Sequence, residues 1–394
     1  MSLMTEILRA RTLSDLIGVV PALFGFHPQD SLVAICLDGP SGQAGFRLRS
    51  DLPPVAQART AARALVGYLA AQEPAGVVLI AFATADRDAE ARAVVDAMTA
   101  ALTAKEVRVT DAVRYDGDRY FSYSCDDPRC CPPEGVPCAA DSSLMLAEAV
   151  YRGLEVLPSR DDLVRRFAPV VGPARRKAEK ATAREAAALE RRCRASRRAH
   201  GAPGQRVPVS GVPVDGVPVD GAPGQRDPEV IRHALDRVLP IVDRVLLRAG
   251  DIATDVGGAP SDAAGGALSV ADKATLSVAD KAALSVWTSL TVVRDVLWSR
   301  ITHDNAAASL AMWREVGVSA VAPFQAAPLT LAAFSAWLSG DGAQAQCALD
   351  RVEEVSPAYS MAELIQTALT RCIDPRAWPG LPGDDILRVV PGLS

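Results

Sequence analysis

Residues 75–82 read AGVVLIAF, an unbroken apolar run with the length of a strand. A run of this kind predicts a strand buried on both faces of a sheet. Helical patterns flank it over 55–71 and 87–103, and a further strand is predicted over 106–115. Strands that alternate with helices in this order predict a parallel sheet with right-handed crossovers.

The neighbouring segments make the predicted sheet mixed. Residues 31–37 and 45–52 predict the two strands of a hairpin, and an amphipathic helix is predicted before them over 12–26. Beyond the central strands, a hairpin turn leads into a strand over 119–124, and a helix is predicted over 139–154. The first part of the chain is therefore predicted to be an α/β domain with a mixed sheet.

The rest of the chain is predicted to be helical, so the fold class is α/β plus all-α. The expected parts are an α/β domain over 1–157, a basic helix with a linker over 158–227, and an α-helical domain over 228–394. Residues 160–200 hold 13 Lys/Arg against 5 Asp/Glu. Residues 201–226 repeat units such as VPVDG, which cannot form a packed core. A second repeat at 268–283 is interpreted as a duplicated surface loop or helix start.

The composition indicates a globular chain with no nucleic-acid or membrane partner. The 394 residues are 49% hydrophobic and carry a net charge of −5. The basic stretch 175–198 lacks interleaved aromatic residues, so a solvated helix is expected there. No run reaches the roughly 18–20 apolar residues of a spanning helix. The run LIGVVPALFGF (16–26) lacks a small-residue cleavage site, so we expect a cytoplasmic protein.

Motifs of common enzyme classes are missing from the sequence. It contains no G-x-x-x-x-G-K-[ST] phosphate loop, no G-x-G-x-x-G after a strand, no G-x-S-x-G and no H-E-x-x-H. The four histidines show no metal-ligand spacing among themselves. We therefore lean towards a protein that is not an enzyme, and we assign no catalytic residue.

Half of the eight cysteines lie in YSCDDPRCCPPEGVPC, residues 123–138. The spacing C-x4-C-C-x6-C lacks the second C-x2–4-C knuckle of structural zinc sites and the C-x-x-C of thioredoxin-like sites. Adjacent Cys130 and Cys131 are expected to point in different directions. We therefore predict reduced, buried thiols in a loop fixed by prolines, and no cofactor.

Zinc binding is the alternative interpretation of this run. Cys125, Cys138 and one of the adjacent pair, Cys130 or Cys131, would supply three thiolates, with His27 as a fourth ligand. Redox chemistry or a disulfide is a further alternative, although a reducing cytoplasm argues against structural disulfides.

Polar residues around the first hairpin are candidates for binding a small anionic ligand. His27 and Asp30 lie where the first predicted strand begins. Arg47 and Arg49 share one face of the next strand, and two guanidinium groups there would bind a carboxylate or a phosphate. The alternatives are turn formation by Asp30 and a solvated strand face for the two arginines.

Residues 327–365 predict a helix pair followed by a further helix. An apolar helix that contains Trp337 ends at Gly340, Asp341 begins the second helix, and Tyr359 opens the third. Small alanines on the packing side resemble a tetratricopeptide-type pair, and an ordinary helical hairpin is the alternative. On the first interpretation, Trp337, Asp341 and Tyr359 are candidates for contacting a protein partner.

Three stretches carry a family resemblance: GFHPQDSLV (25–33), SCDDPRCCPPEG (124–135) and AWLSGDGAQAQCALDRVEEVSPAYSMAELI (336–365). In this order they resemble the actinobacterial family catalogued as domain of unknown function 4192. The family pattern covers Cys125, Cys130 and Cys131, but it does not extend to Cys138. The family has no established activity, so the resemblance implies no mechanism.

These observations favour a cytoplasmic interaction or adaptor protein that uses its helical domain to bind an unidentified protein partner. One alternative is an α/β domain that binds or transforms a small anionic molecule through His27, Asp30, Arg47 and the cysteine loop. The other alternative is a metal-binding protein that uses the cysteine loop. Convergence of the candidate residues in one pocket would favour the anionic-ligand alternative.

Overall fold

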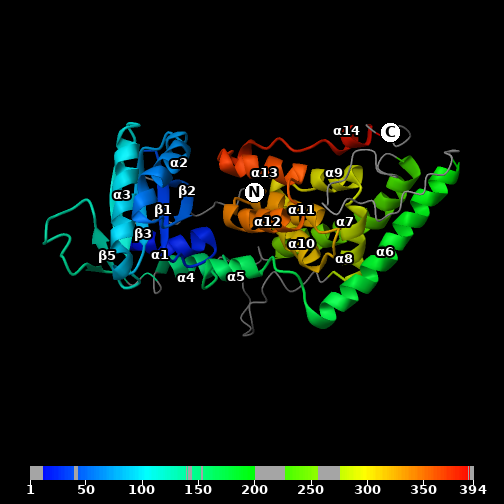
Figure 1. Ribbon diagram of the computed structural model, residues 1–394, viewed down its shortest axis with the longest axis horizontal. Coiled ribbons are helices and arrows are strands. Elements are labelled where there is room, and N and C mark those ends of the chain that lie inside the picture. The colour runs from blue at the N-terminus through cyan, green and yellow to red at the C-terminus, as the bar shows by residue number, and fades with distance from the viewer. Residues whose placement is uncertain are drawn as a thin grey trace. The chain divides into compact units, whose positions relative to one another are not determined.

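The chain forms two compact units, Met1–Asp162 and Leu163–Ser394. The computed structural model describes residues 12–39, 43–138, 140, 144–151, 154–199, 227–255, 276–388 and 390. The first unit is built on a mixed sheet with helices and the second is helical, which confirms the predicted fold class (Figure 1). The repeats at 201–226 and the first copy of the later repeat, 268–275, lie outside the described residues.

The first unit contains a six-stranded sheet. Its strands, in spatial order, are β2 (Gln43–Asp51), β1 (Ser31–Asp38), β3 (Gly76–Phe82), β4 (Val109–Tyr115), β5 (Arg119–Ser122) and β6 (Val136–Pro137).

The described sheet is mixed, and most of its neighbouring strands run antiparallel. β3 pairs in parallel with β4, whereas β1 is antiparallel to both β2 and β3. The hairpin partner β1 is inserted between β2 and β3, so the strands before and after α2 (Ala58–Ala70) are not hydrogen-bonded to each other. The predicted hairpins β1–β2 and β4–β5 and the predicted parallel pair β3–β4 are confirmed. The prediction that β2 lies parallel beside β3 was wrong, because β1 separates the two strands.

The run AGVVLIAF is buried because helices cover both faces of the sheet. Val77, Leu79 and Ala81 point into a core shared with α2 and α3 (Asp88–Thr103). The alternate residues Val78 and Ile80 point into a second core shared with α1 (Leu13–Phe24) and α4 (Leu144–Tyr151). Successive side chains of a strand point to opposite faces of the sheet, so alternate residues of β3 enter the two cores.

A buried arginine joins the sheet to α3. Arg114 of β4 is 5% exposed, and its Nε donates a hydrogen bond to Asp88 Oδ1 at 2.9 Å. Its Nη1 donates to the carbonyl oxygen of Ala83 at 3.1 Å. Tyr123 Oη donates to the same Asp88 oxygen at 2.7 Å. Asp88 therefore holds together β4, the first turn of α3 and the beginning of the cysteine run.

The second unit consists of helices, and α5 (Arg160–Arg165) spans the division between the units. Its α-helices are α6 (Gly172–Ala199), α7 (Pro228–Asp255), α8 (Val278–Trp287), α9 (Thr291–Ser299), α10 (Ala306–Ser319), α11 (Ala326–Leu338), α12 (Gly342–Val355), α13 (Ser360–Thr370) and α14 (Gly383–Arg388).

The centre of the second unit is α11. Every residue of this helix is buried, as expected for a helix that is apolar all round. It packs against α10, α12 and α13. Near its C-terminal end, Trp337 and Phe334 contact Trp378, which stacks on Trp298 of α9 with ring centroids 5.7 Å apart. This aromatic cluster stabilises the contact between α11, α9 and the segment after α13.

The second copy of the later repeat, residues 276–283, begins α8. Ser277 Oγ accepts a hydrogen bond from the Asp280 amide, and the Asp280 carboxylate accepts one from the Ser277 amide. This reciprocal pair is a capping box, which explains why a helix begins inside the repeat. Among the described helices, none combines the length and the apolar character that crossing a bilayer requires.

Candidate metal centre

The cysteine run is a loop that leaves the sheet after β5 and returns to it as β6. Arg119 pairs with Pro137, and Tyr120 pairs with Val136. The loop is therefore closed at its base by backbone hydrogen bonds of the sheet itself. In Figure 1 it extends from the end of the sheet near the label β5.

Short-range hydrogen bonds fix the part of the loop that carries the thiols. Ser122 Oγ accepts a hydrogen bond from the Cys125 amide at 3.0 Å. The carbonyl oxygen of Asp127 accepts hydrogen bonds from the amides of both Cys130 (3.0 Å) and Cys131 (2.7 Å). The chain therefore makes a tight turn between Asp127 and Cys131, and this turn brings the cysteines back towards Cys125.

A second turn anchors the loop to β5. The Gly135 amide donates to the carbonyl oxygen of Pro132 at 2.8 Å, and Arg119 Nη1 donates to the Gly135 carbonyl oxygen at 2.6 Å. Gly135 has φ +79°, and a Cβ atom at this position would lie 2.8 Å from the Phe121 ring. Glycine is needed here both for its left-handed backbone and for the close approach to the ring.

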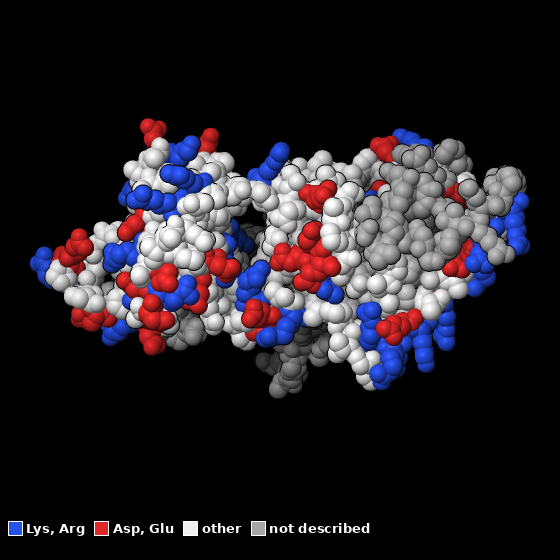
Figure 2. All heavy atoms as spheres, viewed as in Figure 1, with Lys and Arg blue, Asp and Glu red and all other residues white. Residues whose placement is uncertain are grey.

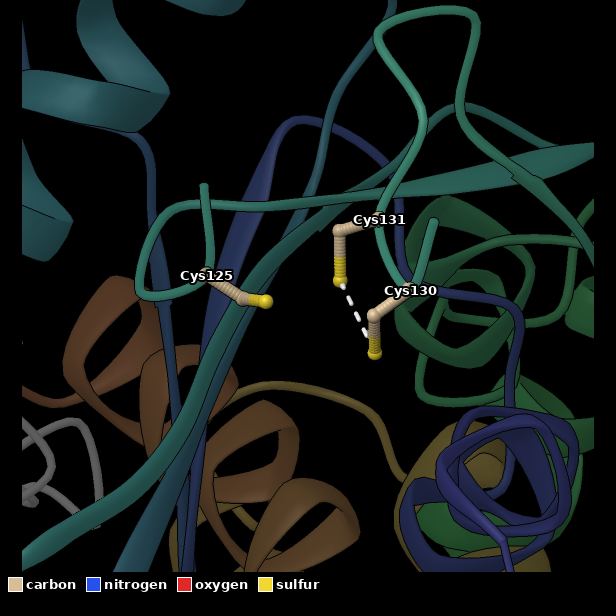
Figure 3. A group of neighbouring side chains, drawn as sticks. All are labelled: Cys125, Cys130 and Cys131. Carbon is tan, nitrogen blue, oxygen red and sulfur yellow. Dashed lines mark hydrogen bonds between the residues drawn. The ribbon is translucent and has the colours of Figure 1, made fainter. Parts of the chain in front are cut away.

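The three thiols of Cys125, Cys130 and Cys131 converge on one point. Their Sγ atoms all lie within 4.8 Å of one another, and Figure 3 shows Cys125 pointing towards the other two. The Sγ atoms of Cys130 and Cys131 are 3.9 Å apart. The expectation that adjacent cysteines point in different directions is wrong for this loop, because the turn at Asp127 is helical in character and not extended.

The thiols are also more accessible than the sequence suggested. Cys130 is exposed, whereas Cys125 and Cys131 are half-buried. The prediction of buried thiols beside the sheet is therefore wrong for these three cysteines. All three cysteines are free in the structure, and the reduced, deprotonated form of such a side chain is the form that binds metal ions.

The separations between the thiols match a zinc site. Zinc binds thiolate sulfur at about 2.3 Å in tetrahedral geometry, so two ligating sulfurs lie about 3.8 Å apart. The Cys130–Cys131 distance of 3.9 Å is close to this value. Cys125 must move by no more than about 1 Å to complete a three-sulfur face, because its sulfur lies within 4.8 Å of the others.

Cys138 and His27 lie outside this group. Among the described residues, the group of potential metal ligands contains Cys125, Cys130 and Cys131 alone. Cys138 is buried in the core that α1 and α4 share with the sheet. Its amide donates to the carbonyl oxygen of Asp118 at 2.8 Å, which fixes the end of the loop.

The electrostatics of the cluster favour a cation. Loss of hydration raises the pKa of the Cys131 thiol to about 11, and hydrogen bonds with the Cys125 and Cys130 sulfurs add to the increase. Burial raises the pKa of Tyr120 on β5, and negative charge at Cys131 and Cys130 raises it further. A bound cation removes this repulsion, because it stabilises thiolates directly.

The residues around the first hairpin are engaged in separate interactions. The His27 amide donates to the carbonyl oxygen of Leu157 at 3.0 Å. Asp30 has φ +43° and forms an ion pair with Arg87, with Oδ2 and Nη1 3.4 Å apart. This pair ties the turn before β1 to the segment between β3 and α3.

Arg47 and Arg49 lie on one face of β2, as predicted, and both guanidinium groups have partners within the first unit. Arg47 Nε donates to the carbonyl oxygen of Leu23 at 3.1 Å. Arg49 Nε donates to Ser31 Oγ at 2.9 Å, and its Nη2 lies 2.6 Å from Asp51 Oδ1. Burial lowers the pKa of Arg49. The two side chains fasten β2 to α1 and to the start of β1.

The candidates for contacting a protein partner have roles inside the second unit. Trp337 is 5% exposed and Tyr359 is 3% exposed. Tyr359 Oη accepts a hydrogen bond from Arg294 Nη1 at 2.9 Å. Asp341 is the N-cap of α12 and accepts a hydrogen bond from the Gln344 amide at 2.9 Å.

Sequence reasoning missed the residues that shape the thiol loop. Ser122, Asp127, Arg119 and Gly135 position the three cysteines, although none of them is a metal ligand. A signal for Asp127 was present, because Asp-Pro favours the start of a turn. Arg119 and Gly135 are brought together by the pairing of β5 with β6. This pairing could not be predicted from the sequence, because β6 has only two residues and so shows no strand pattern.

Comparison with known proteins identifies one family. The model of the family described as Domain of unknown function (DUF4192) matches residues 14–376. The match covers most of both units and the whole cysteine loop. No curated protein and no solved structure matches the chain.

Proposed function

The chain belongs to the DUF4192 family, whose description assigns no activity, and we propose that this member binds one zinc ion through Cys125, Cys130 and Cys131. The observation that carries the proposal is the convergence of three free cysteine side chains, whose Sγ atoms lie within 4.8 Å of one another. The hydrogen bonds of the loop, at Ser122 and Asp127, support it because they pre-form the site before the ion arrives.

The fourth coordination position is supplied from outside the group. Structural zinc sites take four protein ligands, whereas sites that react or exchange keep a position for water or a substrate. Because Cys130 is exposed, an ion bound by these thiols would lie at the surface, where water or an added thiol could reach it. The proposed centre is therefore an open site, suited to holding an exchangeable ion or ligand.

A reducing compartment is part of this proposal. Zinc requires thiolates, and three thiols this close together would be oxidised in an oxidising compartment. We therefore place the protein in the cytoplasm, where the thiols stay available for metal.

The other candidate functions have less support from the described contacts. An adaptor that recognises its partner through Trp337 or Tyr359 would have to expose side chains that are buried in the second unit. A small anion at Arg47 and Arg49 would compete with the carbonyl of Leu23 and the carboxylate of Asp51. The three thiols, in contrast, already lie close enough together to bind one ion.

Cobalt substitution tests the proposal. Tetrahedral Co(II) replaces zinc in thiolate sites, and its sulfur-to-metal charge-transfer absorption increases with the number of thiolates. We expect the reduced protein to reach saturation at about one cobalt ion per chain, and zinc to displace the cobalt. Cys125→Ser should lower both the charge-transfer intensity and the affinity.

The control is Cys372→Ser, which removes a half-buried thiol of the second unit. When cobalt is added, this variant should show the same charge-transfer absorption and the same affinity as the wild-type chain. Saturation without charge-transfer absorption, or an unchanged spectrum in Cys125→Ser, would show that the three thiols do not bind the ion.

A further inference from the structure

One side of α6 packs within the second unit. Its buried residues are Ala178, Thr182, Cys193 and Ser196, which recur at helical spacing, and the helix packs against α8 and α7. Glu185 fixes this side, because its carboxylate accepts a hydrogen bond from Trp287 Nε1 at 2.9 Å. The packed side therefore defines an opposite side that faces away from α7 and α8.

Basic side chains gather on that opposite side. At 100° per residue, six of them fall within an arc of about 80° of the helix surface. We call this set the basic stripe: Arg176, Lys180, Arg184, Arg191, Arg194 and Arg198, all exposed. Figure 2 shows basic side chains projecting along the edge where Figure 1 places α6.

The acidic residues of α6 do not neutralise the middle of the stripe. The helix holds ten Lys/Arg and three Glu. The glutamates form the ion pairs Glu179–Arg175 (3.0 Å), Glu185–Arg237 (2.9 Å) and Glu190–Arg194 (3.0 Å). Within the described part of the chain, no ion pair joins Arg176, Lys180, Arg184 or Arg191 to a carboxylate. Within the described residues, these four members of the stripe therefore present positive charge that no carboxylate pairs with, whereas Arg194 is paired with Glu190.

We propose that the basic stripe binds the phosphate backbone of double-stranded nucleic acid without sequence preference. Residues 176–198 span about 33 Å of helix, which is close to one turn of duplex DNA, about 34–36 Å. Most of the stripe is arginine, whose planar group donates two parallel hydrogen bonds to a phosphate. Neutralising a row of phosphates releases counterions, and this release provides the free energy of binding.

Two other anionic partners fit the stripe less well. A membrane-surface helix buries large apolar side chains below its basic residues, and the described side chains of α6 include no exposed large apolar residue. Single-stranded nucleic acid is bound by stacking bases on aromatic rings, and α6 contains no aromatic residue. From the sequence, the lack of aromatic residues in this stretch argued against nucleic-acid binding of any kind. Binding to the phosphate backbone of a duplex, however, does not require aromatic residues.

The test is the salt dependence of binding between the full chain and a fluorescein-labelled duplex DNA, followed by anisotropy. The stripe variant is Lys180→Gln/Arg184→Gln/Arg191→Gln. The matched control is Arg59→Gln/Arg63→Gln/Arg108→Gln, which removes the same charge from exposed positions of the first unit. Circular dichroism checks that both variants remain helical.

For the wild-type chain we expect log K to fall with log[salt] with a slope of about −5, since five or six phosphates each contribute about −0.9. The stripe variant should have a slope smaller in magnitude by about 2.7, and a weaker affinity at 0.1 M salt by at least about tenfold. The control should retain most of the slope. Equal loss in both variants, no binding to the duplex, or tighter binding to phosphatidylserine vesicles would overturn the proposal.

Discussion

The Sγ atoms of Cys130 and Cys131 lie 3.9 Å apart although the two residues are neighbours in the chain. In an extended strand, consecutive side chains point to opposite faces, whereas in a helical turn they are separated by about 100°. The two amides share the carbonyl oxygen of Asp127, which imposes the helical kind of turn. The adjacent pair therefore forms one edge of the thiol site, and Cys125 supplies the third corner.

Gly135→Ala should weaken zinc binding without unfolding the first unit. The new Cβ atom would lie 2.8 Å from the Phe121 ring, and φ +79° is unfavourable for alanine. Strain of this kind costs about 1–3 kcal/mol, so displacement of the loop should lower zinc affinity by about tenfold or more. Competition with a chromophoric chelator measures the affinity.

The control for that variant is Gly39→Ala. Gly39 also has a positive φ, of +61°, but a Cβ atom there meets nothing within 4 Å and the position lies in the turn after β1. The Gly39→Ala variant should lower the stability of the first unit and leave the zinc affinity unchanged. Full zinc affinity in Gly135→Ala would mean that this turn does not position the thiols.

Alkylation of Cys131 in metal-free protein should be slow near neutral pH and should accelerate strongly with pH. Its pKa is raised to about 11, so the reactive thiolate is scarce at pH 8. Against a free thiol of pKa about 8.5, iodoacetamide should react about 100-fold more slowly at pH 8. Peptide mass spectrometry measures the rate, which should rise about tenfold per pH unit up to about pH 11. A rate at pH 8 equal to that of the free thiol would contradict the proposed environment.

Trp337→Ala should destabilise the second unit. Trp337 is 5% exposed and contacts Phe334 and Trp378, and truncating a buried aromatic costs about 3–5 kcal/mol. All five tryptophans follow residue 162, so tryptophan fluorescence during urea unfolding reports on this unit. Leu364→Ala, at a side chain that is 63% exposed, should change the free energy of unfolding by less than about 0.5 kcal/mol. An unchanged midpoint for Trp337→Ala would be inconsistent with the aromatic cluster.

Asp88→Ala should loosen the first unit and leave the second unit intact. The substitution removes the acceptor of Arg114 Nε and of Tyr123 Oη. Leaving a buried donor unpaired costs about 1–3 kcal/mol, and the half-exposed position of Asp88 favours the lower end. Hydrogen exchange of the β3 and β4 amides should become faster, while the tryptophan fluorescence transition stays in place. Asp96→Ala, on the exposed side of α3, should leave exchange unchanged.

Local patterns predicted most of the elements of this fold. The apolar runs at 31–37 and 75–82 became β1 and β3, because a strand buried on both faces needs apolar residues throughout. The helices of the C-terminal pair also lie close to their predicted positions, since Asp341 caps the second one. Each of these elements is specified by residues adjacent in sequence.

Features that depend on distant contacts were not predictable in the same way. The insertion of β1 between β2 and β3 depends on which strand edges meet, and no residue pattern encodes this order. The convergence of Cys125 with Cys130 and Cys131 depends on the Asp127 turn and on the β5–β6 pairing. From spacing alone we therefore expected Cys130 and Cys131 to point in different directions, whereas the loop geometry brings both sulfurs close to that of Cys125.

The zinc content of the purified chain tests the central claim most directly. Protein produced in zinc-containing medium and purified under reducing conditions without chelator should contain about one zinc ion per chain by elemental analysis. Cys125→Ser and Cys130→Ser should lose this zinc, and Cys372→Ser should keep it. A wild-type chain that holds no zinc even after reconstitution, or a Cys125→Ser chain that keeps a full equivalent, would contradict a metal centre at the three converging thiols.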